Sequence, residues 1–391
     1  MNKDLVLRSV FNVMTRQTRS LTIGGAVFAI VLFCFTGSLF AQSVAQSLAQ
    51  SLDQSSDQET QSAESAAPKT LIDWADFDTF DTGYESSVAM HPSGLIVEVH
   101  SSGQTFLTYN GLFYRIGKLD PTKGTVAWGP SRRWVTKDKN GSWPAVAITK
   151  EGYAILTYSN AFTKSNAVLR YSVGTLDLNG GTDQLINFKV QNEKLDTGFH
   201  DSISVNYNGT IAEAHEADGK KGMYYRLGHL KAPASGNFNI VWDSGDGGQP
   251  WDDGVNPQIA INDNNDVVEV HQASANDHRL HYTRAKISGN RITFGKDHPF
   301  FSAGERPAVT LLNNGYLVEM HASNYDKKTG LSELRYRAGT LDRNNATLIN
   351  WPDGTTIGYV ANPGGIGTNG AYLVSTAQRG THLYYSWAIA P

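Results

Sequence analysis

Cysteine is almost absent from this sequence. The single Cys34 lies inside an apolar run that extends from residue 23 to residue 41. If this run is removed as part of a secretory signal, the remaining chain has no disulfide and no thiol nucleophile. Any chemistry of the folded part must then come from other side chains.

Clustered positive charge is absent as well. The formal net charge is −4, and only 18% of the residues are charged. Without a basic block, nucleic acid is not expected as a partner. The sequence also lacks an H-E-x-x-H motif, EF-hand spacing and a nucleophile elbow. Its 38 glycines and 10% aromatic residues suit a β-rich protein with many turns.

The first 68 residues differ from the rest in composition. Basic residues at positions 3, 8, 16 and 19 precede the apolar run, and Ala41 follows it. This pattern predicts a signal peptide over residues 1–41, with an uncleaved N-terminal anchor as the alternative. In the second case residues 23–41 would tether the chain to a membrane. Residues 42–68 are rich in Gln and Ser and predict a disordered linker. The expected localisation is secreted, periplasmic or at the cell surface.

One template recurs from Gly83 to the C-terminus, and each copy contains four short predicted strands. The third strands of the copies are LFYRIG, LRYSVG, MYYRLG, LHYTRA, LRYRAG and LYYSWA. A repeat of about 50 residues with four strands is typical of a β-propeller blade. The stretch TLIDWADF (70–77) matches TLINWPDG (347–354), which belongs to the fourth strand of the fifth copy. We therefore expect an all-β fold over residues 69–391: a six-bladed β-propeller whose N-terminal strand closes the last blade.

The second predicted strand of four repeats carries Glu and His two positions apart. These pairs are Glu98 and His100, Glu213 and His215, Glu269 and His271, and Glu319 and His321. In three of these repeats an Arg follows the Tyr of the third strand, at positions 115, 226 and 337. Facing positions on antiparallel strands predict a Glu–Arg ion pair within a structural network. The alternative hypothesis is that the histidines also reach a ligand.

The loops between repeats combine aromatic residues with Arg and Asp. Aromatic rings can stack on the faces of sugars while polar groups bind the hydroxyls, which suggests a polysaccharide or glycan partner. The predicted ligand-binding residues are Trp134, Trp143, Trp251, Arg133, His271 and His321.

The repeats also differ from one another, which favours one specialised site and leaves an enzyme open. A polysaccharide lyase requires a His or Tyr base, and an Arg or His to neutralise a uronate. The candidate catalytic residues are His100, His200, His215, Arg132 and Arg306. No cofactor is expected, except that calcium could bind through carboxylate oxygens. The candidate ligands for calcium are Asp243, Asp246, Asp252 and Asp253.

The segments GVNPQIAINDNNDVVEVH (254–271) and LRYRAG (334–339) carry a family resemblance. They resemble repeats of secreted bacterial proteins, some of which are appended to phospholipase-like domains. The resemblance covers residues 70–391 and implies a propeller that is lectin-like in architecture. The first hypothesis is therefore a carbohydrate-binding propeller. The alternatives are a lyase or glycosidase acting over the central channel, and a protein-interaction module.

Overall fold

The structure is a computed structural model. It describes residues 72–103, 111–135, 141–160, 167–217, 222–231, 238–243, 248–295, 298–342, 344–345, 348–351 and 354–391. The predicted signal or anchor (1–41), the predicted linker (42–68) and Asp246 lie outside this set. Within the set, no helix is long and apolar enough to span a membrane. The elements of the described chain are strands, which confirms the all-β class.

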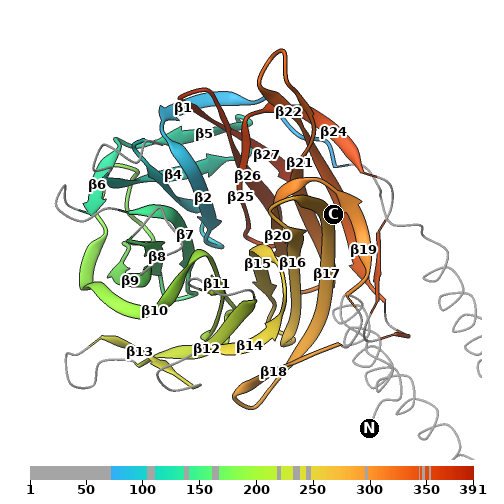
Figure 1. Cartoon of the computed structure of the whole chain (residues 1–391). Coiled ribbons are helices and arrows are strands. Elements are labelled where there is room, and N and C mark those ends of the chain that lie inside the picture. The colour runs from blue at the N-terminus through green and yellow to red at the C-terminus, as the bar shows by residue number, and fades with distance from the viewer. Residues whose placement is uncertain are drawn as a thin grey trace, which may run out of the picture. The chain divides into compact units, whose positions relative to one another are not determined.

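Two sheets hold the first half of the folded chain (Figure 1), and every strand pair in them is antiparallel. The first sheet has the order β2 (Tyr84–Met90), β3 (Leu95–Ser101), β4 (Leu112–Asp120) and β5 (Thr125–Trp128), with β6 (Arg132–Val135) also paired to β4. The second contains β7 (Ser142–Ile148), β8 (Tyr153–Ser159), β9 (Val168–Thr175), β10 (Asn187–Val205), β11 (Thr210–Ala217), β12 (Met223–Lys231), β13 (Asn239–Trp242) and β14 (Gln249–Asp252). The two ends of β10 pair with different strands: residues 187–197 with β9, and residues 198–205 with β11.

Three further sheets complete the fold. One consists of β15 (Val255–Ile261), β16 (Asp266–Ser274), β17 (Asp277–Ser288), β18 (Arg291–Phe294) and β19 (Phe300–Ala303). The next consists of β20 (Glu305–Leu311), β21 (Tyr316–Asp326), β22 (Leu331–Leu341), β23 (Ile349–Asn350) and β24 (Thr355–Val360). The last has the order β1 (Asp78–Thr82), β27 (His382–Ile389), β26 (Tyr372–Arg379) and β25 (Asn362–Thr368), so it joins the first described strand to the last. The strand beside β27 is thus residues 78–82, slightly beyond the TLIDW stretch that was expected to form it.

The predicted turns between the first and second strand of each repeat are confirmed. Their fourth position requires a left-handed backbone, and glycine adopts it without steric cost. Gly94 has φ +83°, Gly152 has φ +84° and Gly315 has φ +86°. In the NDNN turn this position is held by Asn265, with φ +62°. Asparagine is among the non-glycine residues that tolerate this conformation best.

The repeated glycine of the third strand makes room for a tryptophan of the fourth. A Cβ atom on Gly117 would lie only 2.8 Å from the Trp128 ring, and one on Gly228 would lie 2.8 Å from the Trp242 ring. Real Cβ atoms do not approach that closely. The pairing of these residues across adjacent strands therefore explains why Gly and Trp recur together in the sequence.

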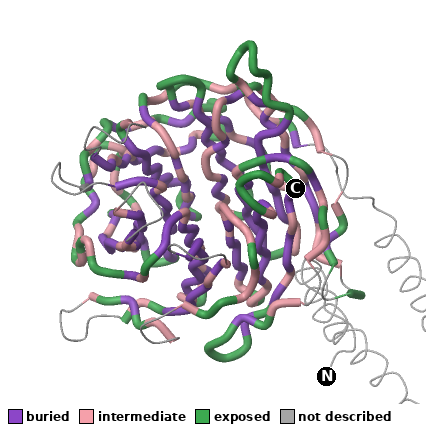
Figure 2. The backbone as a smooth tube through the Cα atoms, in the orientation of Figure 1, coloured by how far each residue is buried: buried purple, intermediate pink, exposed green. Residues whose placement is uncertain are grey.

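The apolar core lies between neighbouring sheets. Val97 and Tyr114 of one sheet cluster with Val146 and Leu156 of the next, and similar clusters recur along the chain. In Figure 2 the buried backbone accordingly follows the inner strands, while exposed segments lie at the periphery. Both faces of a sheet contribute, as expected when each sheet packs between two others.

The first strands of the repeats contact one another around the centre (Figure 1). β2 contacts β7 and β25, β10 contacts β7 and β15, and β20 contacts β15 and β25. These strands share no ladder, so side chains bind some of their backbone amides. The amide of Ile259 donates to Ser202 Oγ over 3.1 Å, and the amide of Ile261 donates to Ser204 Oγ over 3.2 Å.

Candidate active site at the entrance of the central cavity

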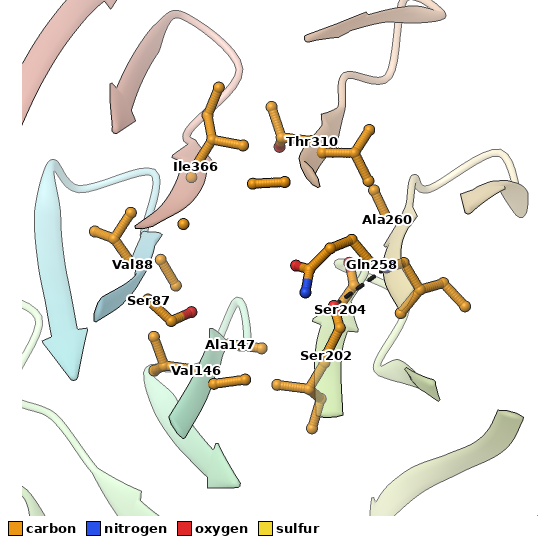
Figure 3. A pocket seen from close by; sticks show the side chains of 18 of the residues that line it. Ser87, Val88, Val146, Ala147, Ser202, Ser204, Gln258, Ala260, Thr310 and Ile366 are labelled. Atoms are coloured by element: carbon orange, nitrogen blue, oxygen red, sulfur yellow. Dashed lines mark hydrogen bonds between the residues drawn. The ribbon is translucent and has the colours of Figure 1, made fainter. Parts of the chain in front are cut away.

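A cavity of about 460 Å³ lies between these first strands. Figure 3 shows that the side chains around it come from different strands, among them Ser87, Ala147, Ser204 and Gln258. Most of the labelled side chains are small, so the centre of the fold stays open instead of filling with core residues. The cavity is large enough for a small ligand or one end of a larger one.

The first strands share a β-bulge near their N-terminal ends. In β2 the register with β3 shifts between Tyr84 and Ser87, and equivalent shifts occur in β7, β10, β15 and β20. A bulge redirects a side chain and is common beside active sites. At five bulges a residue other than glycine has a positive φ: Glu85 (+55°), Trp143 (+47°), His200 (+51°), Asn256 (+53°) and Arg306 (+51°).

We call these five the entrance residues, because each lines the cavity and each is partly exposed to solvent. They occupy equivalent positions in successive repeats, yet all five differ in chemical type. A left-handed backbone is strained for such side chains, and strain of this kind concentrates at functional sites. The entrance of the cavity is therefore lined by five different side chains rather than by copies of one residue.

Glu85 supplies a carboxyl group to this site. Its Oε2 accepts a hydrogen bond from the backbone amide of Trp143 over 2.9 Å. Burial raises the pKa of Glu85, while the Trp143 amide and the charges of Arg306 and His200 act in the opposite direction. A carboxyl group with a raised pKa is suited to donate a proton near neutral pH.

His200 forms a dyad with Glu216. Its Nδ1 lies 2.6 Å from Glu216 Oε1, and the same oxygen accepts the backbone amide of Asn256 over 2.7 Å. Glu216 is buried, whereas His200 is partly exposed. The Trp143 ring meets the His200 ring edge-on, with 4.1 Å between the centroids. A carboxylate that binds one ring nitrogen orients the other, which can then act as a base.

Asp201 is a second carboxyl group of the cavity lining, and it is buried. Burial raises the pKa of Asp201 to about 8; the Thr157 hydroxyl lowers it and Glu213 raises it. The neutral acid therefore predominates at pH 7.

The four histidines of the Glu–His motif lie elsewhere, within the sheets. Each is buried, and its Nδ1 binds the Glu two residues earlier. The distances are 3.0 Å from His100 to Glu98, 2.9 Å from His215 to Glu213, 3.1 Å from His271 to Glu269 and 3.0 Å from His321 to Glu319. Of the two hypotheses for this motif, the geometry favours the structural one, because the rings have almost no contact with solvent.

The register of Glu and Arg is as predicted, but their bonds differ from the expected ion pair. Glu98 faces Arg115 on the adjacent strand, yet it binds His100. Arg115 pairs instead with Asp81 of β1, 3.3 Å away, and binds the Phe80 carbonyl. The network therefore links neighbouring sheets.

The same arrangement recurs in the third repeat and changes in the fourth. Arg226 of β12 pairs with Asp196 of β10 and binds the Leu195 carbonyl. In the fourth repeat Thr283 replaces the Arg, and His298 pairs with Asp252 in its place. Facing positions within one sheet do not determine which carboxylate of the next sheet lies closest to the Arg side chain.

Four candidate residues of the inter-repeat loops are not brought together: Trp134, Trp251, Arg132 and Arg133. Trp134 is buried, and its Nε1 donates to Ser172 Oγ over 3.1 Å. Trp251 stacks on Phe294, with 4.5 Å between the centroids. Arg132 binds the Asp183 carbonyl, and Arg133 lies over the Phe113 ring. These contacts indicate packing between strands rather than a shared ligand surface.

The metal candidates do not assemble among the described residues, where no group of three or more His, Cys, Asp or Glu side chains could hold a metal ion. Asp243 lies near His229, Asp252 binds His298, and Asp253 is exposed. Asp246 lies outside the described residues, so the calcium site stays a prediction.

Of the residues predicted from sequence, the cavity brings together Trp143, His200 and Arg306. Sequence reasoning missed Glu85, Asp201, Glu216 and Asn256. The sequence does contain a signal for the entrance residues: the position just before the first-strand segments SSVA, PAVA, DSIS, PQIA and PAVT is occupied by a different residue in each of these repeats. It was not recognised because a bulge cannot be located from alternation alone.

No protein family model matches this chain, and no curated protein sequence matches it. Several solved structures have a similar fold. "Hadza microbial sialidase Hz136" matches with a TM-score of 0.54 and 10% identity, over 79% of this chain and 66% of that chain. A protein of unknown function from Dyadobacter fermentans has a TM-score of 0.54 and 12% identity, over 83% of this chain and 100% of that one.

The alpha-L-arabinofuranosidase arb93a of Fusarium graminearum matches with a TM-score of 0.50 and 10% identity, over 82% of this chain and 98% of that chain. At such identities the likeness shows the fold alone. Together with the radial sheets and their central cavity, it shows that this chain has the architecture of a β-propeller.

Proposed function

We propose that this protein is a carbohydrate-active β-propeller of six blades, which cleaves a glycan at the entrance of its central cavity. The observation that carries the proposal is the convergence of five chemically different side chains from equivalent bulges on one cavity. A lectin with repeated sites would instead present similar residues in successive repeats. The presence of different chemical groups around one cavity favours catalysis, in which each group has a different role.

The six-bladed arrangement is supported by contacts around the centre. The first strands β2, β7, β10, β15, β20 and β25 contact one another in a cyclic order. The pairing of β1 with β27 supports closure by the N-terminal strand, because it lets the last sheet gain its fourth strand from the beginning of the chain. Such closure removes a free sheet edge.

The site has the parts that glycan cleavage requires. The partly exposed Trp143 ring offers a face on which a sugar can stack. Glu85, with its raised pKa, can protonate the leaving glycosidic oxygen. The His200–Glu216 dyad and Arg306 lie on the same entrance and can accept a proton and bind an anionic group. The carbohydrate-active enzymes with similar folds agree with this proposal, although they do not identify the substrate.

The test is incubation of the full chain with a panel of neutral and acidic polysaccharides, followed by size-exclusion chromatography. We expect at least one polymer to be shortened. Glu85→Gln should abolish shortening while the protein still co-elutes with the polymer, and Arg291→Ala, which changes an exposed residue of β18, serves as the control. Co-elution without shortening by the unmodified chain would support the lectin instead. If no polymer is shortened and none co-elutes with the protein, the proposal is rejected.

A further inference from the structure

Arg306 is the cationic group of the entrance. Among the described residues it forms no ion pair within 4.0 Å, and Glu85 is the carboxyl group whose charge it affects. Burial raises the pKa of Glu85 and the charge of Arg306 lowers it, so Arg306 is the cation nearest to this carboxyl group in its electrostatic effect. Arginine binds carboxylates through a planar fork of donors. The entrance therefore has a place for an anionic group of the substrate.

His200 has the geometry of a base. A carboxylate can only accept, so the bond to Glu216 places the proton of the neutral ring on Nδ1. The lone pair then lies on Nε2, on the side of the ring that is not held by Glu216. The Asn256 amide donates to the same Glu216 oxygen, which stabilises the ionised carboxylate and thus the orientation of the dyad.

The carboxyl groups of the cavity are less suited to hydrolysis. A glycoside hydrolase needs one carboxylic acid and one ionised carboxylate that faces the sugar or a water molecule. Burial raises the pKa of both Glu85 and Asp201, and Glu216 Oε1 is already bound by His200 and the Asn256 amide. The site thus offers acids and an imidazole base rather than an acid and a carboxylate base.

Building on the proposed function, we propose that the substrate is a uronate-containing polysaccharide and that its chain is cleaved by β-elimination. Arg306 binds the uronate carboxylate and stabilises the charge that develops on it. His200 Nε2 removes the proton from C5, the electron pair of that C–H bond forms the C4=C5 double bond, and the C4–O bond breaks. Glu85 gives its proton to the departing oxygen. No water is consumed, and proton exchange with solvent restores His200 and Glu85.

The proposal is tested with the full chain on polygalacturonate, alginate and hyaluronan, with a neutral glucan and a neutral xylan for comparison. Two signals are measured: polymer length, and the ultraviolet absorbance of the unsaturated uronate. We expect both signals with at least one polyuronate. Shortening without the absorbance, accompanied by incorporation of oxygen-18 from labelled water, would overturn elimination and leave glycan cleavage intact. No shortening of any polymer would reject both.

Variants assign the roles once a substrate is found. His200→Asn should lower kcat by about a hundredfold or more with little change in KM, because general-base catalysis contributes on that scale. Asparagine is chosen because it tolerates the left-handed backbone of His200. Arg306→Gln should raise KM strongly for the polyuronate, and methyl esterification of the polymer should have a similar effect on the unmodified enzyme. Arg291→Ala is the matched control. If Arg306→Gln cleaves free and esterified polymers as the unmodified chain does, the assignment of the uronate is wrong.

Discussion

The backbone amide of Ile72 donates a hydrogen bond to the Tyr336 hydroxyl, 2.6 Å away, although 264 residues separate them. Equivalent bonds join the Ile186 amide to Tyr114, 3.3 Å away, and the Ile349 amide to Tyr282, 3.2 Å away. The Tyr of each third strand thus binds the fourth strand of the next sheet. Residues near Ile72 take the place of that fourth strand for the last sheet.

Removal of this hydroxyl should weaken the attachment of the N-terminal segment. Tyr336→Phe leaves the buried Ile72 amide without its partner, and we expect the free energy of unfolding to fall by about 1–3 kcal/mol. Chemical denaturation measures the change. Tyr225→Phe is the matched control, since its hydroxyl forms only a 3.4 Å bond to the Ile292 carbonyl. An equal effect of both substitutions would contradict a special role for the bond to Ile72.

The buried Glu–His pairs should differ in their sensitivity to substitution. Glu98 faces Arg115, whereas Glu269 faces Thr283, so Glu269 has no arginine opposite it. Burial raises the pKa of Glu269 to about 7, and its Oε1 has no hydrogen-bond partner among the described residues. We expect Glu98→Gln to lower the free energy of unfolding by ~1–3 kcal/mol at pH 7. Glu269→Gln should cost less, because one oxygen of Glu269 already lacks a hydrogen-bond partner among the described residues, whereas both oxygens of Glu98 bind His100.

Urea denaturation of the two variants side by side measures this difference. Gln keeps the shape of Glu, so packing changes little in either case. A larger loss for Glu269→Gln would show that its bond to His271 depends on full ionisation.

Asp201 should make stability depend on pH. Its pKa is raised to about 8 in the folded chain, compared with about 3.9 for an unperturbed Asp. Below the unfolded pKa both states are protonated and the contribution of Asp201 is fully present. As the pH rises toward the folded pKa, only the unfolded state ionises, so stability is lost.

Asp201→Asn should remove this dependence. Between about pH 4 and pH 8 we expect the free energy of unfolding of the unmodified chain to fall by on the order of a few kcal/mol relative to that of the variant. Thermal denaturation across this range is the measurement. Asp183→Asn changes an exposed residue and serves as the control. Its curve of stability against pH should run parallel to that of the unmodified chain. Parallel curves for Asp201→Asn as well would show that the Asp201 carboxyl ionises freely in the folded state.

Substitution of the two tryptophans Trp143 and Trp134, both predicted as ligand contacts, should affect different properties: glycan binding in the first case and stability in the second. Trp143 is partly exposed at the entrance, so Trp143→Asn should weaken glycan binding by about tenfold, or ~1.4 kcal/mol. Trp134 is buried and bonded to Ser172, so Trp134→Ala should lower the free energy of unfolding by ~3–5 kcal/mol. Titration calorimetry measures glycan binding, and chemical denaturation measures the free energy of unfolding, for both variants. Normal stability with lost binding in Trp134→Ala would reverse the assignment.

The repeated strands, their turns and the all-β class were determined by the sequence itself. Alternation of apolar residues, Gly at the left-handed turn position and the recurrence of Gly with Trp are local features, and the repeats contain enough copies to make them visible. The match between TLIDW and TLINW likewise pointed to a link between the two ends of the folded chain. That link is made by residues 72–82. The Ala75 amide donates to the Trp387 carbonyl, and the strand that pairs with β27 begins at Asp78.

Only the tertiary structure decided which side chains meet. The His residues of the Glu–His motif and the entrance histidine His200 look alike in sequence, yet the first are buried and the second lines a cavity. Glu85 and Arg306 are 221 positions apart, and they share a site because equivalent bulges lie around one centre. Bulge geometry and the carboxylates of a neighbouring sheet depend on how sheets pack against each other, and that packing is not encoded in the pattern of any single repeat.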